Sequence, residues 1–154
     1  MALAVRRIVT GHNSSGRAVF SSDEILSAQR LGVQIWSTDR SPADNTDATD
    51  GAERAIAITS PGGSAIRVMS IEPGHRSPMH RTLSIDYGIV LEGELDLELD
   101  DGATKHLFAG DIVVQRGTMH AWINNGTQPC KIAFILLEAL PLVIHGKALD
   151  PTHA

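Results

Sequence analysis

The chain has 154 residues, of which 42% are hydrophobic and 20% charged, and a formal net charge of -5. These values are typical of one globular domain. The negative charge argues against a nucleic-acid partner, which requires clustered lysine and arginine. The sequence contains no run of about eighteen apolar residues, so no membrane span is expected. The single cysteine, Cys130, cannot form an internal disulfide. At the start of the chain, a basic pair follows a very short apolar stretch, which is the wrong order for a secretory signal. Both features favour a cytoplasmic protein.

Residues 1–54 predict an N-terminal extension that packs on the main domain. Residues 5–10 and 17–20 are expected to form short strands around a turn at 11–16. Ser22, Asp23 and Glu24 predict the cap of a short helical turn that runs to about Arg30. Residues 32–37 predict an apolar strand. The aspartate-rich stretch 41–51 has no periodicity, and we interpret it as a solvated connector rather than a lid.

The pattern from residue 55 onward predicts only β-structure. Leucine alternates with acidic residues over 95–99, which is typical of a half-buried strand. Further strands are expected at 55–59, 64–72, 105–108, 112–115, 120–124 and 131–138, with hairpin signals at Asp101-Gly102 and Asn125-Gly126. Many short strands with regular turns predict a barrel or sandwich, here over residues 55–145, followed by a tail at 146–154. Spare apolar strands at both termini favour a homodimer.

Two stretches carry polar side chains at strand spacing. His80, Thr82, Ser84 and Asp86 alternate along the first stretch, and His120, Trp122 and Asn124 along the second. A strand points alternate side chains to one face, so each set shares a face, whereas Tyr87 is expected to point outward. If both faces look into one barrel, two imidazoles and a carboxylate converge.

These stretches resemble the paired motifs of the cupin superfamily. Thr82 stands where a second histidine is usual, Asp86 replaces the usual glutamate, Arg116 replaces a proline, and the loop before Gly117 is one residue short. The resemblance covers roughly residues 55–139 and implies an all-β, double-stranded β-helix (jelly-roll) barrel with a short N-terminal strand and helix extension. The positions that match the family pattern are Gly74, His80, Gly93, Gly110, Gly117, His120 and Asn124.

The resemblance implies that His80, Asp86 and His120 bind one divalent metal ion. Two imidazoles and a carboxylate with open positions are associated with iron, and are compatible with manganese or zinc. A second reading is that Thr82 marks a lost site, in which the histidines are hydrogen-bonded pocket residues. Aspartate is one carbon shorter than glutamate, so Asp86 could instead orient a histidine.

Four further residues are candidates for catalysis or substrate binding. Thr82 could donate to a substrate oxygen, and His75 could act as an acid or base at the mouth. Trp122 could form a flat apolar wall, and Arg67 could clamp a carboxylate or phosphate. Each has a plainer alternative, which is a strand residue for Thr82, a solvated loop histidine for His75, core packing for Trp122 and a surface salt bridge for Arg67.

Three functions follow from these expectations. The first is a metal-dependent lyase or decarboxylase that acts on a small carboxylated or keto compound. The second is a dioxygenase with non-haem iron, and the third is a small-molecule-binding protein without catalysis. All three predict a small-molecule partner, with neither nucleic acid nor a membrane involved.

Overall fold

The computed structural model describes residues 3–28 and 32–152, which are almost entirely strands, turns and loops. The first strands are β1 (Ala4–His12), β2 (Ala18–Ser27) and β3 (Val33–Thr38). The middle of the chain forms β4 (Ser64–Ile71), β5 (Ser84–Glu92), β6 (Glu94–Leu99), the short turn η1 (Asp100–Gly102), β7 (Thr104–Phe108) and β8 (Ile112–Arg116). The last strands are β9 (His120–Ile123), β10 (Cys130–Glu138), β11 (Val143–Ile144) and β12 (Lys147–Ala148).

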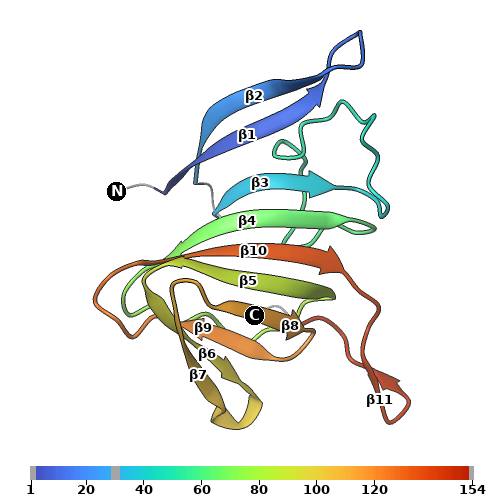
Figure 1. The fold of residues 1–154 in the computed structure, drawn as a ribbon. Coiled ribbons are helices and arrows are strands. Elements are labelled where there is room, and N and C mark those ends of the chain that lie inside the picture. The colour runs from blue at the N-terminus through green and yellow to red at the C-terminus, as the bar shows by residue number, and fades with distance from the viewer. Residues whose placement is uncertain (1–2, 29–31, 153–154) are drawn as a thin grey trace.

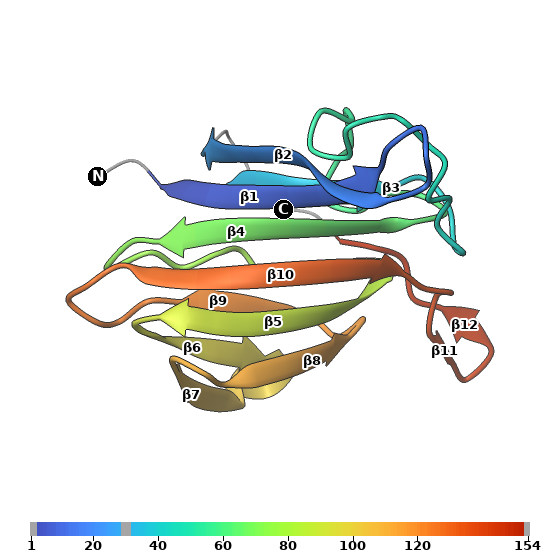
Figure 2. The same cartoon turned by 45° about the horizontal axis from the view of Figure 1, so that its top comes forward.

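Two sheets make the barrel. A five-stranded sheet in the order β3-β4-β10-β5-β8 lies against a three-stranded sheet in the order β7-β6-β9 (Figure 1). Figure 2 shows β9 and β6 behind β10 and β5. The all-β barrel predicted from the sequence is therefore confirmed. β3 lies before the predicted domain boundary at residue 54, yet it forms the edge of the five-stranded sheet.

The core lies between the two sheets. It contains Leu95 and Leu97 of β6, Trp122 of β9, and Ile132 of β10. The predicted alternation on β6 is wrong at the end of the strand, where Leu99 is exposed. It is confirmed over residues 95–98, because Leu95 and Leu97 are buried whereas Asp96 and Glu98 remain partly exposed. Burying one such leucine contributes about 1.5–3 kcal/mol, so the leucine face of β6 helps to hold the three-stranded sheet against the five-stranded one.

The predicted helical turn from Ser22 to Arg30 is wrong over residues 22–28, while residues 29–31 lie outside the described part of the chain. β2 continues as a strand to Ser27, in antiparallel register with β1. Arg6 of β1 forms an ion pair with Asp23, and Arg7 forms one with Glu24. These cross-strand pairs use the acidic residues that would otherwise have capped a helix.

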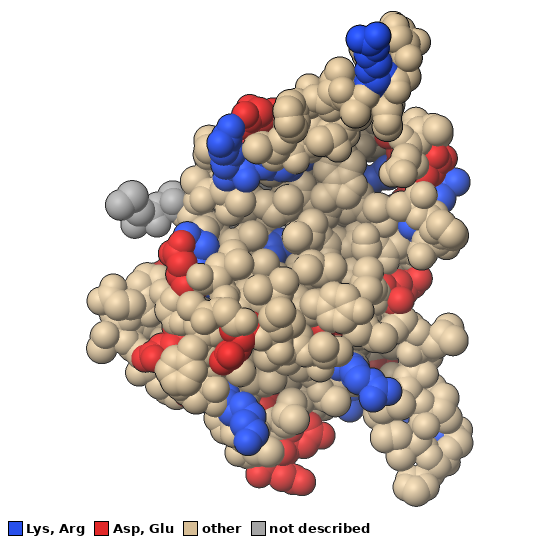
Figure 3. Space-filling model, in the orientation of Figure 1, with Lys and Arg blue, Asp and Glu red and all other residues tan. Residues whose placement is uncertain are grey.

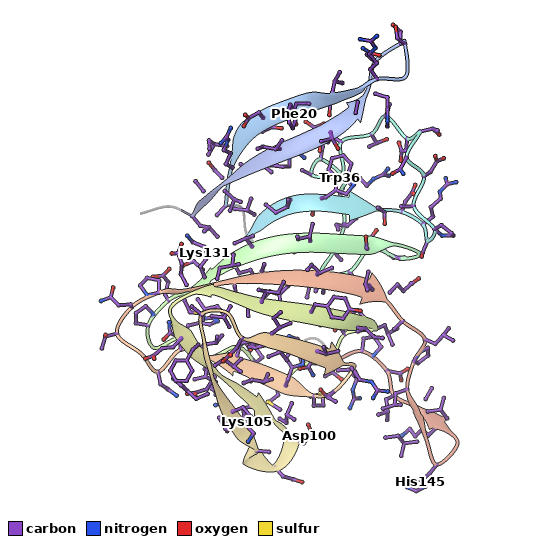
Figure 4. The ribbon with its side chains drawn as sticks, viewed as in Figure 1. Phe20, Trp36, Asp100, Lys105, Lys131 and His145 are labelled. Atoms are coloured by element: carbon purple, nitrogen blue, oxygen red, sulfur yellow. The ribbon has the colours of Figure 1, made fainter. Side chains whose placement is uncertain are left out.

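Arg7 connects the β1–β2 hairpin to the barrel. Its side chain is 3% exposed, and its guanidinium donates to both carboxylate oxygens of Asp50 and to the carbonyl of Ile35. The guanidinium also lies 5.7 Å from the ring centroid of Trp36, which Figure 4 shows above β3. A buried charge with two carboxylate partners is a strong positional constraint, so Arg7 sets how the hairpin sits on β3.

The strand predicted at residues 55–59 is absent, and this segment is irregular. Within it, Arg67 donates to the carbonyl of Ala57. Just before it, Gln34 donates to the carbonyls of Gly51, Ala52 and Arg54. The Asn125-Gly126 hairpin is also wrong, because β9 pairs with β6 whereas β10 pairs with β4 and β5.

The surface of the described residues carries mixed charge. On the face in Figure 3, Lys and Arg lie among Asp and Glu without one large patch of either sign. Within residues 3–28 and 32–152 no helix has the length and apolar character needed to cross a membrane.

Candidate functional site

A pair of imidazoles lies where the chain before β5 meets β9. His80 and His120 occupy an antiparallel bridge, and each backbone N–H donates to the carbonyl of the other at 3.0 Å. Residues directly opposite each other in such a bridge place their side chains on the same face. The ring centroids are 4.2 Å apart with an interplanar angle of 51°. The predicted convergence of His80 and His120 is therefore observed.

Backbone carbonyls orient both rings. Nδ1 of His80 lies 2.8 Å from the carbonyl oxygen of Pro78, and Nδ1 of His120 lies 3.0 Å from that of Thr118. A carbonyl oxygen only accepts, so Nδ1 carries the proton in each ring. In a neutral ring Nε2 is then left with a lone pair. The pair can offer two Nε2 acceptors to a ligand.

His120 is held neutral by its surroundings. The pKa of His120 is lowered to about 4, chiefly by burial and to a smaller extent by the nearby His80, while the hydrogen bond to Thr118 acts in the opposite direction. His120 is 2% exposed and its ring packs edge-on against Trp122 at 5.7 Å. At neutral pH His120 therefore presents an uncharged imidazole.

Asp86 is the buried carboxyl of the site. Ser84 Oγ donates to Oδ1 at 2.5 Å and Thr82 Oγ1 donates to Oδ2 at 3.2 Å. Burial raises the pKa of Asp86, against the two hydroxyl hydrogen bonds and the nearby His80, which all lower it. The net result is a pKa raised above the ordinary value of an aspartate.

These groups face one cavity of about 170 Å³. Most of its wall is apolar, and Trp122 and Phe134 pack together there with ring centroids 5.2 Å apart. Gly88 of β5 lies beneath these two rings, where an added Cβ would be 3.4 Å from Phe134 and 3.5 Å from Trp122. Gly88 therefore lies in close packing distance of both rings. The lining residues are Ile58, Arg67, Met69, Ile71, His75, Ser77, His80, Thr82, Asp86, His120, Trp122, Phe134 and Leu136.

The structure brings all of the sequence-predicted site residues to this cavity. Thr82 is buried, and its hydroxyl donates a hydrogen bond to Asp86 rather than to a substrate. His75 lies at the exposed end of the wall, and Trp122 forms part of the apolar wall. Arg67, for which a surface salt bridge was the plainer expectation, is instead 6% exposed.

Two other expectations concern neighbours of the site. Tyr87 points outward, as predicted, and is 37% exposed. Asn124 braces the turn after β9, because its side-chain N–H groups donate to Ile71 and Gln128 and its oxygen accepts from Gly126. Neither residue lines the cavity.

Sequence reasoning missed most of the apolar wall. Phe134 and Leu136 are two residues apart on β10, so the strand alternation could have shown that they share a face. Met69 and Arg67 have the same relation on β4. Ile58 had no comparable signal, because it lies on an irregular segment.

The predicted three-residue metal centre is not assembled. Within residues 3–28 and 32–152, no three His, Cys, Asp or Glu side chains are grouped so that they could hold a metal ion. Asp86 lines the same cavity as the imidazoles, but its two oxygens accept from Ser84 and Thr82. Two imidazole nitrogens fall short of the three protein ligands that open metal sites commonly use. The donor set therefore does not fit the metal centre that the resemblance implied.

Comparison with known proteins agrees with this barrel. Residues 67–136 match the cupin domain. The chain is 41% identical over 157 residues to "Phomopsin biosynthesis cluster protein C'" of Diaporthe leptostromiformis, with 93% of this chain and 83% of the relative covered. It is 38% identical over 159 residues to "Cupin-domain-containing oxidoreductase fogC" of Aspergillus ruber, with 95% and 78% covered.

A solved structure from Klebsiella pneumoniae, described as an uncharacterized conserved protein with a double-stranded β-helix domain, is 27% identical. It aligns with a TM-score of 0.47 and covers 49% of this chain and 68% of its own. The sequence relatives match nearly the whole length of the chain, and they show that it belongs to the cupin family.

Proposed function

We propose that the protein is a cupin-type enzyme that transfers a proton at a carbon next to a carbonyl group, in a lyase or decarboxylase type of reaction on a small organic compound. The observation that carries this proposal is the pairing of His80 with His120 in the same cavity as Asp86. The cavity thus combines two imidazoles, which can accept a proton, with a carboxyl whose pKa burial raises.

The two kinds of group suit the two halves of a proton transfer. His80 is half-buried and lies beside His120, so its imidazole can take a proton from a bound compound and pass it to water at the mouth. Asp86 is fully buried and can donate a proton to the carbon or oxygen on which negative charge develops. Ser84 and Thr82 position its carboxyl for this step.

The apolar wall supports the same chemistry. Trp122, Phe134 and Met69 make the wall of the cavity apolar, and electrostatic interactions are stronger beside an apolar wall than in bulk water. Trp122 is suited to pack against a planar, enolate-like group. The volume of about 170 Å³ restricts the substrate to a small compound.

A divalent ion is not part of this proposal. Iron, manganese or zinc would have to bind through the two imidazoles of this cavity. The roles given above to His80 and Asp86 stand without such an ion.

Oxidoreductase activity is the second candidate. Several relatives are named as cupin-domain-containing oxidoreductases, and the one from Aspergillus ruber covers 95% of this chain. An oxidation needs an electron acceptor such as oxygen, whereas a proton transfer does not. The oxygen requirement therefore separates the two candidates, and binding without turnover would indicate the non-catalytic alternative.

The test is anaerobic incubation with a panel of small β-keto and aromatic acids in deuterated water. NMR would follow deuterium uptake next to the carbonyl and loss of carboxylate. We expect turnover without oxygen in the wild type, loss in His80→Asn, and no change in the control His12→Asn, an exposed imidazole on the hairpin. Turnover only with oxygen would refute the proposal in favour of the oxidoreductase.

A further inference from the structure

Arg67 is a buried cation without an acidic partner. Its side chain is 6% exposed and lies on the cavity-facing side of β4, two residues before Met69. The guanidinium donates through Nη2 to the carbonyl of Ala57. Its Nε is buried and has no hydrogen-bond partner within the part of the chain that the structure describes.

Arg7 is a second deeply buried arginine. Like Arg67, it has a buried Nε without a hydrogen-bond partner among the described residues, but unlike Arg67 it forms ion pairs with Glu24 and Asp50. Arg67 forms no ion pair with any carboxylate among the described residues, and burial lowers its pKa. Arginine nevertheless remains charged in proteins. A buried unpaired charge is costly, and such groups are normally paired or bound to a ligand.

Asp86 does not serve as the missing partner. It lines the same cavity, but its oxygens accept from Ser84 and Thr82. Arg67 also borders an outer cleft of about 760 Å³ between the hairpin and β3. Of the carboxylates that line that cleft, Glu24 and Asp50 are bound to Arg7, and Glu53 forms no ion pair with Arg67 among the described residues. No described carboxylate therefore pairs with Arg67, which also lines the inner cavity.

We infer that the cavity binds the carboxylate of a small, otherwise apolar organic acid, with Arg67 as its counter-ion. The inference rests on the proposed function and names its substrate class. Guanidinium groups match the geometry of a carboxylate, and Arg67 lines the cavity. The remainder of the acid would pack on Met69, Trp122 and Phe134. A single guanidinium in an apolar wall suits a singly charged acid better than a phosphate.

The inference is tested by calorimetric titration of the full chain with benzoate and phenylacetate, the matching neutral amides, and inorganic phosphate. We expect the acids to bind at least tenfold more tightly than the amides or phosphate. Arg67→Met should remove this preference, Arg67→Lys should keep part of it, and Arg116→Met, an equal charge change on the exposed side of β8, should keep all of it. Equal affinity of acids and amides in the wild type would overturn the inference, as would acid binding in Arg67→Met at wild-type strength.

Thermal unfolding supplies a second readout that does not depend on turnover. Without ligand, Arg67→Met should melt at a higher temperature than the wild type, because an uncompensated buried charge is removed. Benzoate should raise the melting temperature of the wild type but not that of Arg67→Met; a rise in both would overturn the inference. If Arg67→Met fails to fold, the acid–amide comparison in the wild type still decides.

The two proposals fail in different ways. Binding that prefers acids over amides, without turnover in the anaerobic assay, would support the inference and refute the proposed function. Turnover of neutral ketones that is unchanged in Arg67→Met would support the proposed function and overturn the inference.

Discussion

The neutral imidazole of His120 should make the stability of the protein depend on pH. Its pKa is lowered from the usual 6.5 to about 4 in the folded chain, chiefly by burial. Above pH 6.5 neither the folded nor the unfolded form is protonated at this residue, so it has no effect. As the pH falls from 6.5 to 4, the unfolded chain takes up a proton that the folded chain does not. The free energy of unfolding therefore decreases over this window.

The size of the effect follows from the shift. Each pKa unit corresponds to about 1.36 kcal/mol, so a shift from 6.5 to about 4 amounts to about 3 kcal/mol at full effect. Since a domain of this size is stable by only about 5–15 kcal/mol, a loss of this size is easily measured. The matched variant is His120→Asn, because asparagine keeps an N–H that can donate to Thr118 but does not titrate in this range.

The assay is urea unfolding of the wild type and His120→Asn at a series of pH values from 7 to 4. Asp86 acts in the opposite sense, because its raised pKa makes the folded chain bind a proton more readily and lowers stability as the pH rises above 3.8. Asp86 is present in both proteins, so the difference between the two curves isolates His120. The wild type should lose about 3 kcal/mol more than the variant. Parallel curves would refute the assignment of a buried, neutral His120.

Three further outcomes are expected. A divalent metal ion should bind weakly, through the two imidazoles. Calorimetry should therefore find that His120→Asn abolishes metal binding and that Asp86→Asn leaves it unchanged. Equal loss of binding in both variants would instead support the three-ligand metal centre. Arg7→Met should lower the free energy of unfolding by about 2 kcal/mol, which is less than the loss of a fully buried ion pair because Glu24 and Asp50 are partly exposed. The variant should also speed proteolysis of the hairpin. An unchanged urea midpoint and an unchanged rate of proteolysis would contradict this. The homodimer stays a prediction, supported by the 78% exposure of Phe20 on the hairpin (Figure 4), and a monomer mass by light scattering at high concentration would rule it out.

Much of the fold was predictable because strand alternation is a local property. A period of two residues predicts the burial of Leu95 and Leu97, the strand at 131–138 and the shared face of His120 and Trp122. The predicted helical turn failed because Asp23 and Glu24 were considered without their partners. Arg6 and Arg7, seventeen residues away in each case, hold them in a strand.

For the site, the sequence by itself determined which residues could face the barrel interior, and it identified His80, Asp86 and His120 by their spacing. Only the tertiary structure decided how these groups meet. The bridge between His80 and His120 brings the two rings to 4.2 Å, while Ser84 and Thr82 hold Asp86. The isolation of Arg67 from every described carboxylate likewise depends on chain segments far apart in sequence. Periodicity is encoded by neighbouring residues, whereas the partner of a buried charge is selected by long-range packing.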